Sequence, residues 1–312
     1  MRPLVSVIMP AYNGEKYIGE AIESILNQTY DNFEFIIVED KSTDGTLSVI
    51  QQYSDSRICL IQNSENRGIA YSTNLGMSKS RGKYIALLDD DDMATKQRLE
   101  WQVAFLEEHE DIDVLGGRSV MIDKDGRFIK YDKEPIYNSD YIKANLLFNN
   151  NKFANCTVMF RKDFVESNNI KYQDNCLGMQ DFRFYIDCAK VGRITSIDHL
   201  VHLKRIHEEE ETVKRRKTHA AERAALFARF QRESIEMSGF RLDEEELQTI
   251  NDIITELPKE TYSGEEVLRL YKVFKEMIRQ AREMEIDYLP GLEYACKKIL
   301  GDRILTRANI FD

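Results

Sequence analysis

The stretch that decides the fold is Tyr84–Met93, YIALLDDDDM, in which five apolar residues run into four consecutive aspartates. The apolar residues do not alternate with polar ones, which indicates a strand that is buried on both faces. Two earlier runs, VIM at 7–9 and FIIV at 35–38, have the same character. Such strands are typical of the middle of a parallel sheet that helices cover on both sides. The aspartates then mark the carboxyl end of a central strand.

Residues 4–117 alternate between strand-like and helix-like segments. The segment 15–28, for example, carries pairs of apolar residues at helical spacing. This alternation predicts right-handed crossovers and an α/β fold with a mostly parallel sheet. The expected strands are 4–10, 33–40, 57–63, 83–90 and 112–117, and the expected helices are 15–28, 42–53, 68–80 and 95–110.

The second half of the chain is less regular and ends in a helical region. The segment 118–132 is typical of a hairpin, with Asp125 and Gly126 at the turn. From about 208 the sequence becomes charged and rich in Ala and Glu, which predicts long helices. We therefore expect an α/β domain at 1–207 and a helical extension at 208–312. The further strands expected are 156–160 and 194–206, and the further helices are 139–150, 161–168, 211–237, 243–256, 263–282 and 290–302.

Composition limits the classes of function. The 312 residues carry a formal net charge of -11, and a general nucleic-acid-binding surface needs basic side chains instead. The apolar runs are too short to span a bilayer, and the N-terminal MRPLVSVIMPAYN is unlike a signal peptide. The five cysteines are scattered and lack CxxC spacing, which favours reduced thiols over a disulfide framework or a zinc site. These features predict a cytoplasmic protein that does not bind nucleic acid.

Three of the expected strands end in polar residues. These ends are Pro10–Asn13, Glu39–Asp40 and Asp89–Asp92. In an open parallel sheet, ligands bind beyond the carboxyl ends of the strands, where loops meet helix N-termini. We therefore expect the three ends to converge on one cleft.

Four adjacent carboxylates need an explanation because they repel one another. Two like charges about 4 Å apart cost roughly 1 kcal/mol in water and about 4 kcal/mol at a dielectric constant of about 20. Capping of the following helix accounts for only one or two of them. A hard divalent cation accounts for more, because it takes oxygen ligands and usually shares its shell with substrate phosphates. The chain has no Walker A motif and no GxGxxG after its first strand, which disfavours P-loop enzymes and dinucleotide oxidoreductases.

Three stretches in combination resemble the family 2 glycosyltransferases of the GT-A fold. They are VSVIMPAYNGEKYIGEAIESILNQTYDNFEFIIVEDKSTDGT at 5–46, NSENRGIAYSTNLGMSKSRGKYIALLDDDD at 63–92 and QDFRFYIDCAKVG at 180–192. The resemblance covers about the first 205 residues. It implies an inverting, metal-dependent transfer of a sugar from a nucleotide-diphosphate sugar, preferably UDP-linked, with Mn²⁺ or Mg²⁺ as the cofactor.

The same resemblance implies roles for single residues of the donor site. Pro10 and Tyr12 would line the pocket for the base and the ribose. Asp40 would accept a hydrogen bond from the edge of the base. Asn66 and Arg67 would contact the base or the diphosphate.

The resemblance also assigns the acidic run and a later basic segment. Asp89 and Asp91 would form the D-x-D motif, with Asp89 towards the ribose and the metal and Asp91 on the metal. Asp90 would also reach the nucleotide. Arg205 and His207 would close over the diphosphate. His207 is in addition a candidate metal ligand, and a purely structural role for it is equally open.

Asp181 resembles the catalytic base of the family, with Gln180 where the family usually has Glu. An acceptor hydroxyl is a poor nucleophile at neutral pH, so a positioned carboxylate must take its proton as the bond forms. The alternative is that Asp181 only caps its helix. The acceptor is expected to be a saccharide or a lipid-linked molecule, with its side of the cleft formed by 135–180, including Asn155, Cys156 and Met159.

The segment 213–236 begins with the basic run at 214–217 and continues with apolar residues at helical spacing. Such a helix can lie peripherally on the inner face of a membrane, and it can equally pack on its own domain or in a homodimer, which is favoured.

For the whole chain, the alternatives are a non-catalytic relative that binds nucleotide sugars and a nucleotidyltransferase of related fold. The second is disfavoured because Pro-Ala-Tyr-Asn, and not a glycine-rich phosphate loop, follows the first strand.

Overall fold

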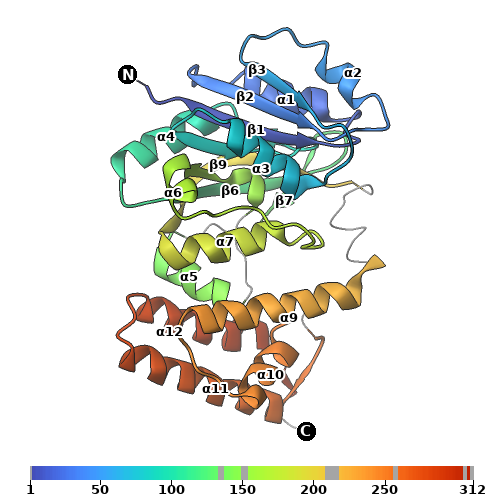
Figure 1. Cartoon of the computed structure of the whole chain (residues 1–312). Helices are drawn as coiled ribbons and strands as arrows, with labels where there is room; N and C mark the ends of the chain where they lie inside the picture. The colour runs from blue at the N-terminus through green and yellow to red at the C-terminus, as the bar shows by residue number, and fades with distance from the viewer. Residues whose placement is uncertain are drawn as a thin grey trace.

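The computed structural model describes residues 2–132, 137–148, 154–207, 218–255, 259–304 and 308–309. A mixed sheet lies at the centre between helices, and a further layer of helices runs along one side (Figure 1). The strand order is β3-β2-β1-β4-β8-β6-β9-β5, with β7 paired to β6. The strands are β1 Val5–Ala11, β2 Phe33–Glu39, β3 Ile58–Gln62, β4 Tyr84–Leu87, β5 Met93–Ala94, β6 Val114–Ile122, β7 Phe128–Tyr131, β8 Met159–Arg161 and β9 Ile194–Arg205.

The first half of the sheet is parallel, as the unbroken apolar runs predicted. β1 lies between β2 and β4 and is parallel to both, and β3 continues the parallel order beyond β2. Every residue of β2 and of β4 is buried. A strand can be apolar along its whole length only where both of its faces are covered, so the pattern and the position in the sheet agree.

Beyond β4 the sheet contains antiparallel pairs. β8 runs antiparallel to both β4 and β6, β6 is parallel to β9, and β5 is antiparallel to β9. The segment 112–117 begins β6, which is separated from β4 by β8 and does not extend the parallel half. The predicted hairpin is confirmed, because β6 and β7 pair antiparallel and Gly126 takes a φ of 80° in the turn.

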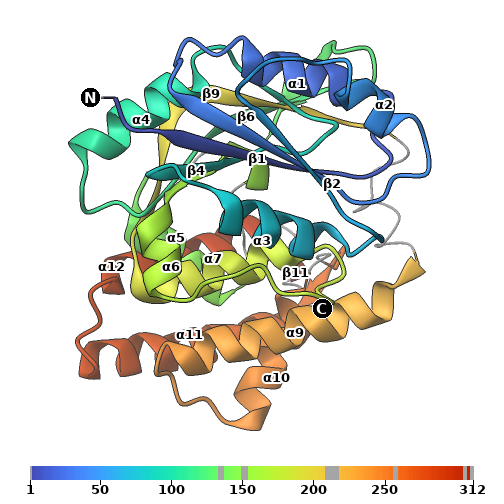
Figure 2. The same cartoon turned by 45° about the horizontal axis from the view of Figure 1, so that its top comes forward.

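Helices cover both faces of the sheet (Figure 2). α1, α2 and α4 bury their apolar residues in one core cluster, on the face where α1 and α4 are seen. α3, α6, α7 and α9 contribute to a second cluster on the opposite face. These helices are α1 Ile18–Leu26, α2 Thr46–Ile50, α3 Ile69–Lys79, α4 Arg98–Glu108, α6 Lys162–Ser167, α7 Gln180–Val191 and α9 Ala220–Met237.

The C-terminal helices share apolar cores with the α/β region. α5 (Ser139–Leu147) joins the two, because Ile142 and Leu146 belong to the second core cluster while Ala144 and Leu147 belong to a third. That third cluster is otherwise built by the C-terminal residues. The boundary at 207/208 stays a prediction, since 208–217 lie outside the described residues. The remaining elements are α10 Glu244–Ile253, α11 Gly264–Glu283, α12 Leu289–Lys298, the 3₁₀ turn η1 Asn155–Thr157, the π-helical η2 Ile299–Ile304, and the pair β10 Tyr262–Ser263 and β11 Ala308–Asn309.

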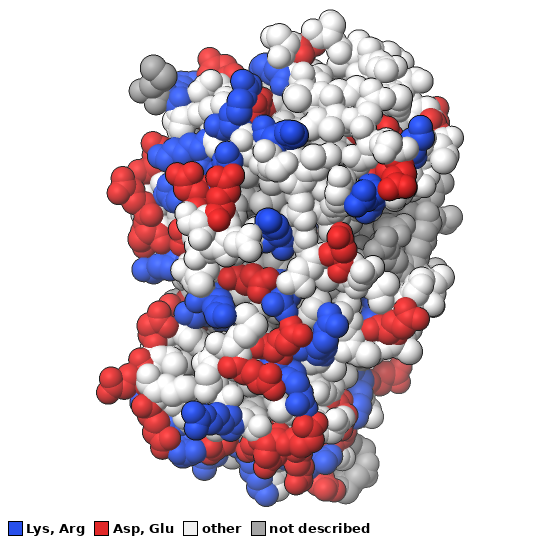
Figure 3. Space-filling model, in the orientation of Figure 1, with Lys and Arg blue, Asp and Glu red and all other residues white. Residues whose placement is uncertain are grey.

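The described part of 213–236 is α9, which buries Leu226, Phe227 and Phe230 in the second core cluster. The basic run at 214–217 is outside the described residues, so contact of this segment with a membrane and dimerisation through these helices both stay predictions. Among the described helices, none is long and apolar enough to cross a membrane. On the face drawn in Figure 3, positive and negative side chains are interleaved over the helical layer.

Candidate active site

The three polar strand ends meet at one edge of the parallel half of the sheet. Ala11 at the end of β1 pairs with Glu39 at the end of β2, and Ile8 of β1 pairs with Leu87 at the end of β4. Adjacent parallel strands present their carboxyl ends on the same side. The expected convergence of 10–13, 39–40 and 89–92 therefore holds in the structure.

The loop after β4 crowds its carboxylates together. Carboxylate oxygens of Asp89, Asp91 and Asp92 all lie within 4.8 Å of one another. Burial, followed by the charges of Asp92 and Asp91, raises the pKa of Asp89 to about 7. Burial and the charge of Asp91 also raise the pKa of Asp90 and of Asp92 well above the usual value. In the absence of a cation, this loop therefore holds protons more tightly than an exposed aspartate does.

Asp90 ties this loop to the end of β1. Its Oδ2 accepts a hydrogen bond of 2.9 Å from the backbone N–H of Tyr12. The backbone of Gly14 passes so close that a Cβ there would lie 2.5 Å from Asp90 Oδ2. Glycine at 14 is thus required by the close approach of the two loops. The side chain of Tyr12 remains 45% exposed beside them.

Asp91 is paired with His207, just beyond the end of β9. The His207 Nε2 lies 2.9 Å from Asp91 Oδ2. The His207 ring also packs against Tyr17, with centroids 5.0 Å apart. A carboxylate oxygen and an imidazole nitrogen at this separation are both able to ligate one divalent ion after a small adjustment. The structure thus places His207 beside Asp91, and the Asp89 carboxylate lies within 4.8 Å of the Asp91 carboxylate, so the three residues that the resemblance assigned to the metal are neighbours.

Arg205 is enclosed and fully engaged with protein groups. Its Nε donates to the backbone oxygen of Asp91, its Nη1 to those of Asp123 and Lys124, and its Nη2 to Glu20 Oε2. In this arrangement the guanidinium fixes the backbone of the acidic loop. Direct contact with a diphosphate would require some of these bonds to be exchanged, and it stays a prediction.

Asp40 organises the loop that carries Asn66 and Arg67. Its Oδ1 accepts hydrogen bonds from Asn63 Nδ2 and from the backbone N–H of Arg67, and its Oδ2 accepts from the N–H of Gly68. The carboxylate itself is buried. It shapes the loop, and its assigned contact with the base stays a prediction.

The other donor-site residues remain accessible. The Asn66 side chain is exposed. The Arg67 guanidinium stacks over the ring of Tyr71 at 4.2 Å and keeps about half of its side chain in solvent. Pro10 lies half-buried in β1, one position before its end. These side chains lie at the same edge of the sheet as the acidic loop.

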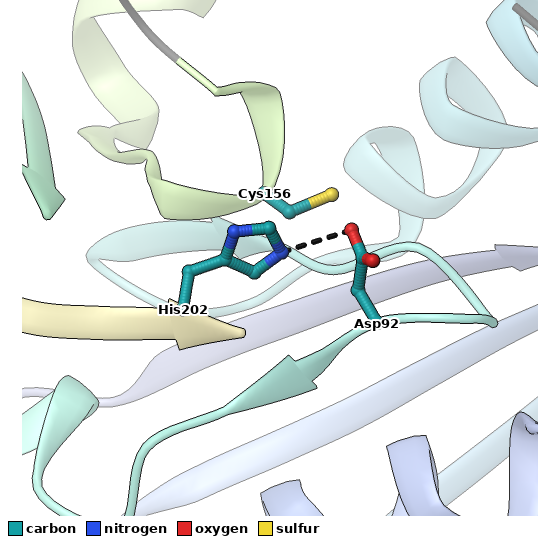
Figure 4. A group of neighbouring side chains, drawn as sticks. All are labelled: Asp92, Cys156 and His202. Atoms are coloured by element: carbon teal, nitrogen blue, oxygen red, sulfur yellow. Dashed lines mark hydrogen bonds and ion pairs between the residues drawn. The ribbon is translucent and has the colours of Figure 1, made fainter. Parts of the chain in front are cut away.

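A buried triad behind the loop was missed by the sequence analysis. Asp92, Cys156 and His202 have potential ligand atoms within 4.8 Å of one another (Figure 4). His202 Nε2 lies 2.9 Å from Asp92 Oδ2, and His202 Nδ1 lies 2.9 Å from Ser119 Oγ. Burial and then the charge of Arg98 lower the pKa of His202 to about 3, so the ring is neutral at pH 7. The triad therefore works as a hydrogen-bonded support that fixes Asp92 against β9.

Arg98 is a second buried residue that sequence reasoning did not find. It lies on α4 with no exposed surface, and its Nη2 donates to the backbone oxygens of Leu87 and Val158. Burial lowers its pKa to about 10, so it stays charged at pH 7. Its charge lies close enough to Asp92 and Cys156 for each to affect its pKa. An arginine at an apolar position of an amphipathic helix was the only available signal.

Asp181 lies in the first turn of α7, where its Oδ1 accepts from the N–H of Phe182 at 2.7 Å. Its charge raises the pKa of two buried phenols, Tyr172 and Tyr185, for which burial is the largest cause. Asp89 also raises the pKa of Tyr172. The charges of Asp181 and Asp89 therefore both act on the phenol of Tyr172. The role of Asp181 as the base stays a prediction.

The residues present fit a divalent cation. The observation that supports this is the donor set itself, namely the crowded carboxylates of Asp89, Asp91 and Asp92 next to the His207 imidazole. Oxygen-rich sets of this kind suit Mg²⁺ or Mn²⁺, and an added imidazole suits Mn²⁺ in particular.

The fold, with its half-parallel sheet, acidic strand end and C-terminal helices, is that of the GT-A glycosyltransferases. The sequence model described as "Glycosyl transferase family 2" matches residues 6–168, and the chain belongs to this family. An uncharacterized glycosyltransferase of Haemophilus influenzae is 34% identical over 215 residues, which are 66% of this chain and 66% of that protein. The aligned part is thus just under two thirds of that relative's length.

Other similar proteins have names that state their ligands. WfgD of Escherichia coli, named "UDP-Glc:alpha-D-GlcNAc-diphosphoundecaprenol beta-1,3-glucosyltransferase", is 29% identical over 198 residues, 62% of this chain and 73% of that protein. The structure of S. aureus TarS 1-349 with UDP-GlcNAc has a TM-score of 0.59 at 20% identity and covers 96% of this chain and 92% of its own. The mannosyltransferase PcManGT of Pyrobaculum calidifontis with GDP-Man and Mn²⁺ has a TM-score of 0.55 at 17% identity, with coverages of 97% and 88%. These two structures show the fold.

Proposed function

We propose that this chain transfers a sugar from a nucleotide-diphosphate sugar to a hydroxyl acceptor in an inverting, metal-dependent reaction. The observation that carries the proposal is the convergence of a crowded carboxylate loop with an imidazole at one sheet edge. A UDP-sugar is the preferred donor. WfgD and TarS support this choice, because the name of the first and the complex of the second contain UDP-sugars.

We further propose a lipid-linked saccharide as the acceptor class, supported by the name of WfgD. The activity is assigned to the family-matching region and its immediate surroundings. Mn²⁺ or Mg²⁺ is the proposed cofactor, and the Mn²⁺ in the PcManGT complex supports it. When bound, the cation would supply Lewis-acid stabilisation of the negative charge that develops on the leaving diphosphate.

Asp91, Asp89 and His207 would hold this cation at the rim of the sheet. Asp90 keeps the β1 loop closed against the acidic loop through the N–H of Tyr12. This bond holds Tyr12 where its exposed ring can pack against the nucleotide. Arg67, half in solvent and stacked on Tyr71, lies 3.6 Å from the exposed Glu65 carboxylate, and a phosphate could replace this surface partner.

Asp181 would accept the proton of the acceptor hydroxyl as the new glycosidic bond forms. Attack from the α7 side and departure of the diphosphate on the side of the acidic loop would be in line, which inverts the anomeric carbon. The carboxylate begins in hydrogen-bonding contact with the N–H of Phe182, which orients it on the first turn of α7.

The experiment that tests the proposal measures nucleotide release from UDP-glucose, UDP-GlcNAc and GDP-mannose in the presence of Mn²⁺ and a lipid-linked saccharide acceptor. Asp181→Asn should lower the rate about 100-fold or more, which is the scale of general-base catalysis, without weakening the binding of the free nucleotide. The control is Asp174→Asn, because this exposed aspartate lies in the same segment. Nucleotide binding without release by the wild type would indicate a non-catalytic, nucleotide-sugar-binding relative. Unchanged release by Asp181→Asn would refute the assignment of the base.

A further inference from the structure

Asn155 is held in one orientation by two buried phenols. Its Oδ1 accepts hydrogen bonds from Tyr172 Oη at 3.1 Å and from Tyr185 Oη at 3.0 Å. Both phenol rings are at most 4% exposed. An amide oxygen has two lone pairs, so these two donors occupy it completely.

The two phenols are themselves fixed by the surrounding fold. Tyr172 exchanges two backbone hydrogen bonds with the Asn74 side chain, at 2.7 and 3.0 Å, and its ring stacks on Phe184 at 4.3 Å. Tyr185 lies within α7 with no exposed surface. Burial and nearby acidic groups raise the pKa of both phenols well above 10, so both remain protonated donors at any physiological pH. The orientation of Asn155 is therefore fixed before any ligand binds.

The opposite end of the amide is left open. In the described part of the chain, no protein group pairs with Asn155 Nδ2, and this nitrogen is not one of the buried polar atoms that lack a partner. The Asn155 side chain is half-buried. Its N–H₂ therefore keeps access to solvent and can only donate.

Asn155 is connected to both acidic parts of the site. The Sγ of the next residue, Cys156, lies within 4.8 Å of an Asp92 carboxylate oxygen at the acidic loop. Tyr185, which donates to Asn155, lies on α7, and Asp181 lies in the first turn of the same helix. A neutral donor near these carboxylates suits an oxygen that is neither charged nor free to ionise, such as a sugar hydroxyl or an N-acetyl carbonyl.

We propose that Asn155 is a positioning residue that donates from Nδ2 to an oxygen of the transferred sugar, with Tyr172 and Tyr185 holding it in place. This inference rests on the proposed function, and it names the sugar as the part of the donor that Asn155 contacts. It predicts that Asn155 discriminates a nucleotide sugar from the bare nucleoside diphosphate. A merely structural role of Asn155 would not produce that difference.

The test is calorimetry with Mn²⁺ on the full chain, using UDP-glucose, UDP-GlcNAc and GDP-mannose as probes. The nucleotide sugar that the wild type binds most tightly is compared with its own nucleoside diphosphate. Asn155→Ala should weaken binding of the nucleotide sugar about 3- to 10-fold, which corresponds to the loss of one hydrogen bond. The affinity for the diphosphate should change less than about twofold. Equal weakening of both ligands, or of neither, would overturn the inference.

Tyr172→Phe is the second variant, because it keeps the ring that stacks on Phe184 and removes only one O–H. Tyr172→Phe should weaken binding of the nucleotide sugar alone, and by less than Asn155→Ala does. Weaker binding of both ligands counts against the inference. The matched control is Asn168→Ala at the end of α6, where the amide donates only to Phe164 O. A wild type that binds neither UDP nor GDP with Mn²⁺ would refute the proposed function itself, whereas binding without discrimination by Asn155 refutes only this inference.

Discussion

His207 Nε2 lies 2.9 Å from Asp91 Oδ2, which joins the end of β9 to the acidic loop after β4. The pair connects two segments that are far apart in the sequence, at the rim where three parallel strands end. The structural pair His202–Asp92 has the same separation, but the Asp92 side chain is 6% exposed, whereas the Asp91 side chain is 27% exposed. The Asp91–His207 pair is therefore the one that an incoming cation can reach.

Replacing His207 should weaken the cation site. His207→Ala removes the imidazole beside Asp91, and we expect the affinity for Mn²⁺ in the presence of UDP to fall about tenfold or more, the scale seen when groups that support a metal are removed. Calorimetry of UDP binding at fixed Mn²⁺ measures the loss. The control is His199→Ala, because His199 is exposed and stacks on Trp101 away from the acidic loop. Equal affinity of His207→Ala and the wild type would exclude His207 from the site.

Removing one charge of the acidic loop should stabilise the metal-free protein while it destroys function. The pKa of Asp89 is raised to about 7 in the folded state, so ionisation of this group opposes folding at higher pH. The cost is fully present above about pH 7, and it shrinks as the pH falls towards the ordinary value for aspartate. Asp89→Asn should therefore raise the Tm of the metal-free protein at pH 8 by about 2–4 °C, with a smaller gain at pH 5.

The same Asp89→Asn variant should lose binding of UDP with Mn²⁺. Asp111→Asn is the control, because this aspartate is exposed. Its neutralisation should leave the Tm at pH 8 and the binding of UDP with Mn²⁺ nearly unchanged. A lower Tm at pH 8 in Asp89→Asn would contradict the view that repulsion between the carboxylates destabilises the metal-free protein.

Loss of the buried Arg98 should be strongly destabilising. Arg98→Met removes the Nη2 donor from the backbone oxygen of Leu87 and the Nε donor from Gln102 Oε1, whereas the oxygen of Val158 keeps the N–H of Leu87. Unpaired buried acceptors cost about 1–3 kcal/mol each, so the free energy of unfolding should fall by roughly 2–5 kcal/mol. Urea denaturation at 25 °C measures it. Arg127→Met is the matched control on an exposed hairpin, and a similar loss in both variants would show that the position of Arg98 has no special role.

A methyl group at Gly14 should disturb the closure of the donor site. In Gly14→Ala the new Cβ would meet Asp90 Oδ2 at 2.5 Å and displace the carboxylate from the N–H of Tyr12. We expect a loss of UDP affinity of about 3- to 10-fold, because one hydrogen bond between the loops is broken. Gly264→Ala is the control, since a Cβ there meets nothing within 4 Å. Normal UDP affinity in Gly14→Ala would show that Asp90 does not organise the pocket.

The parallel half of the fold could be predicted because its apolar runs are local signals. The run at 84–88 and the acidic residues that follow place β4 in the middle of the sheet and put its carboxyl end at the site. The place of β8 between β4 and β6 could not be predicted, because strand order beyond a crossover depends on long-range pairing that no local pattern records.

The candidate site also contains residues that the sequence predicts and residues that it does not. The residues near the ends of β1, β2 and β4 were found because strand ends bring them together by topology alone. His202 and Arg98 were missed, and Cys156 was expected only on the acceptor side of the cleft, because each of the three becomes significant through burial and through partners distant in the sequence. The sequence also does not predict that Glu20 and backbone oxygens enclose Arg205, because arginine side chains are mostly exposed.

The account depends most on joint occupation of the acidic rim by a cation and a diphosphate. Calorimetric titration of UDP, and in parallel GDP, into the wild-type protein with Mn²⁺, with Mg²⁺ and with a chelator tests this most directly. We predict saturable binding of at least one diphosphate that requires the metal and disappears in Asp91→Asn. Absence of binding with either metal, or binding of equal strength in the chelator, would contradict the account.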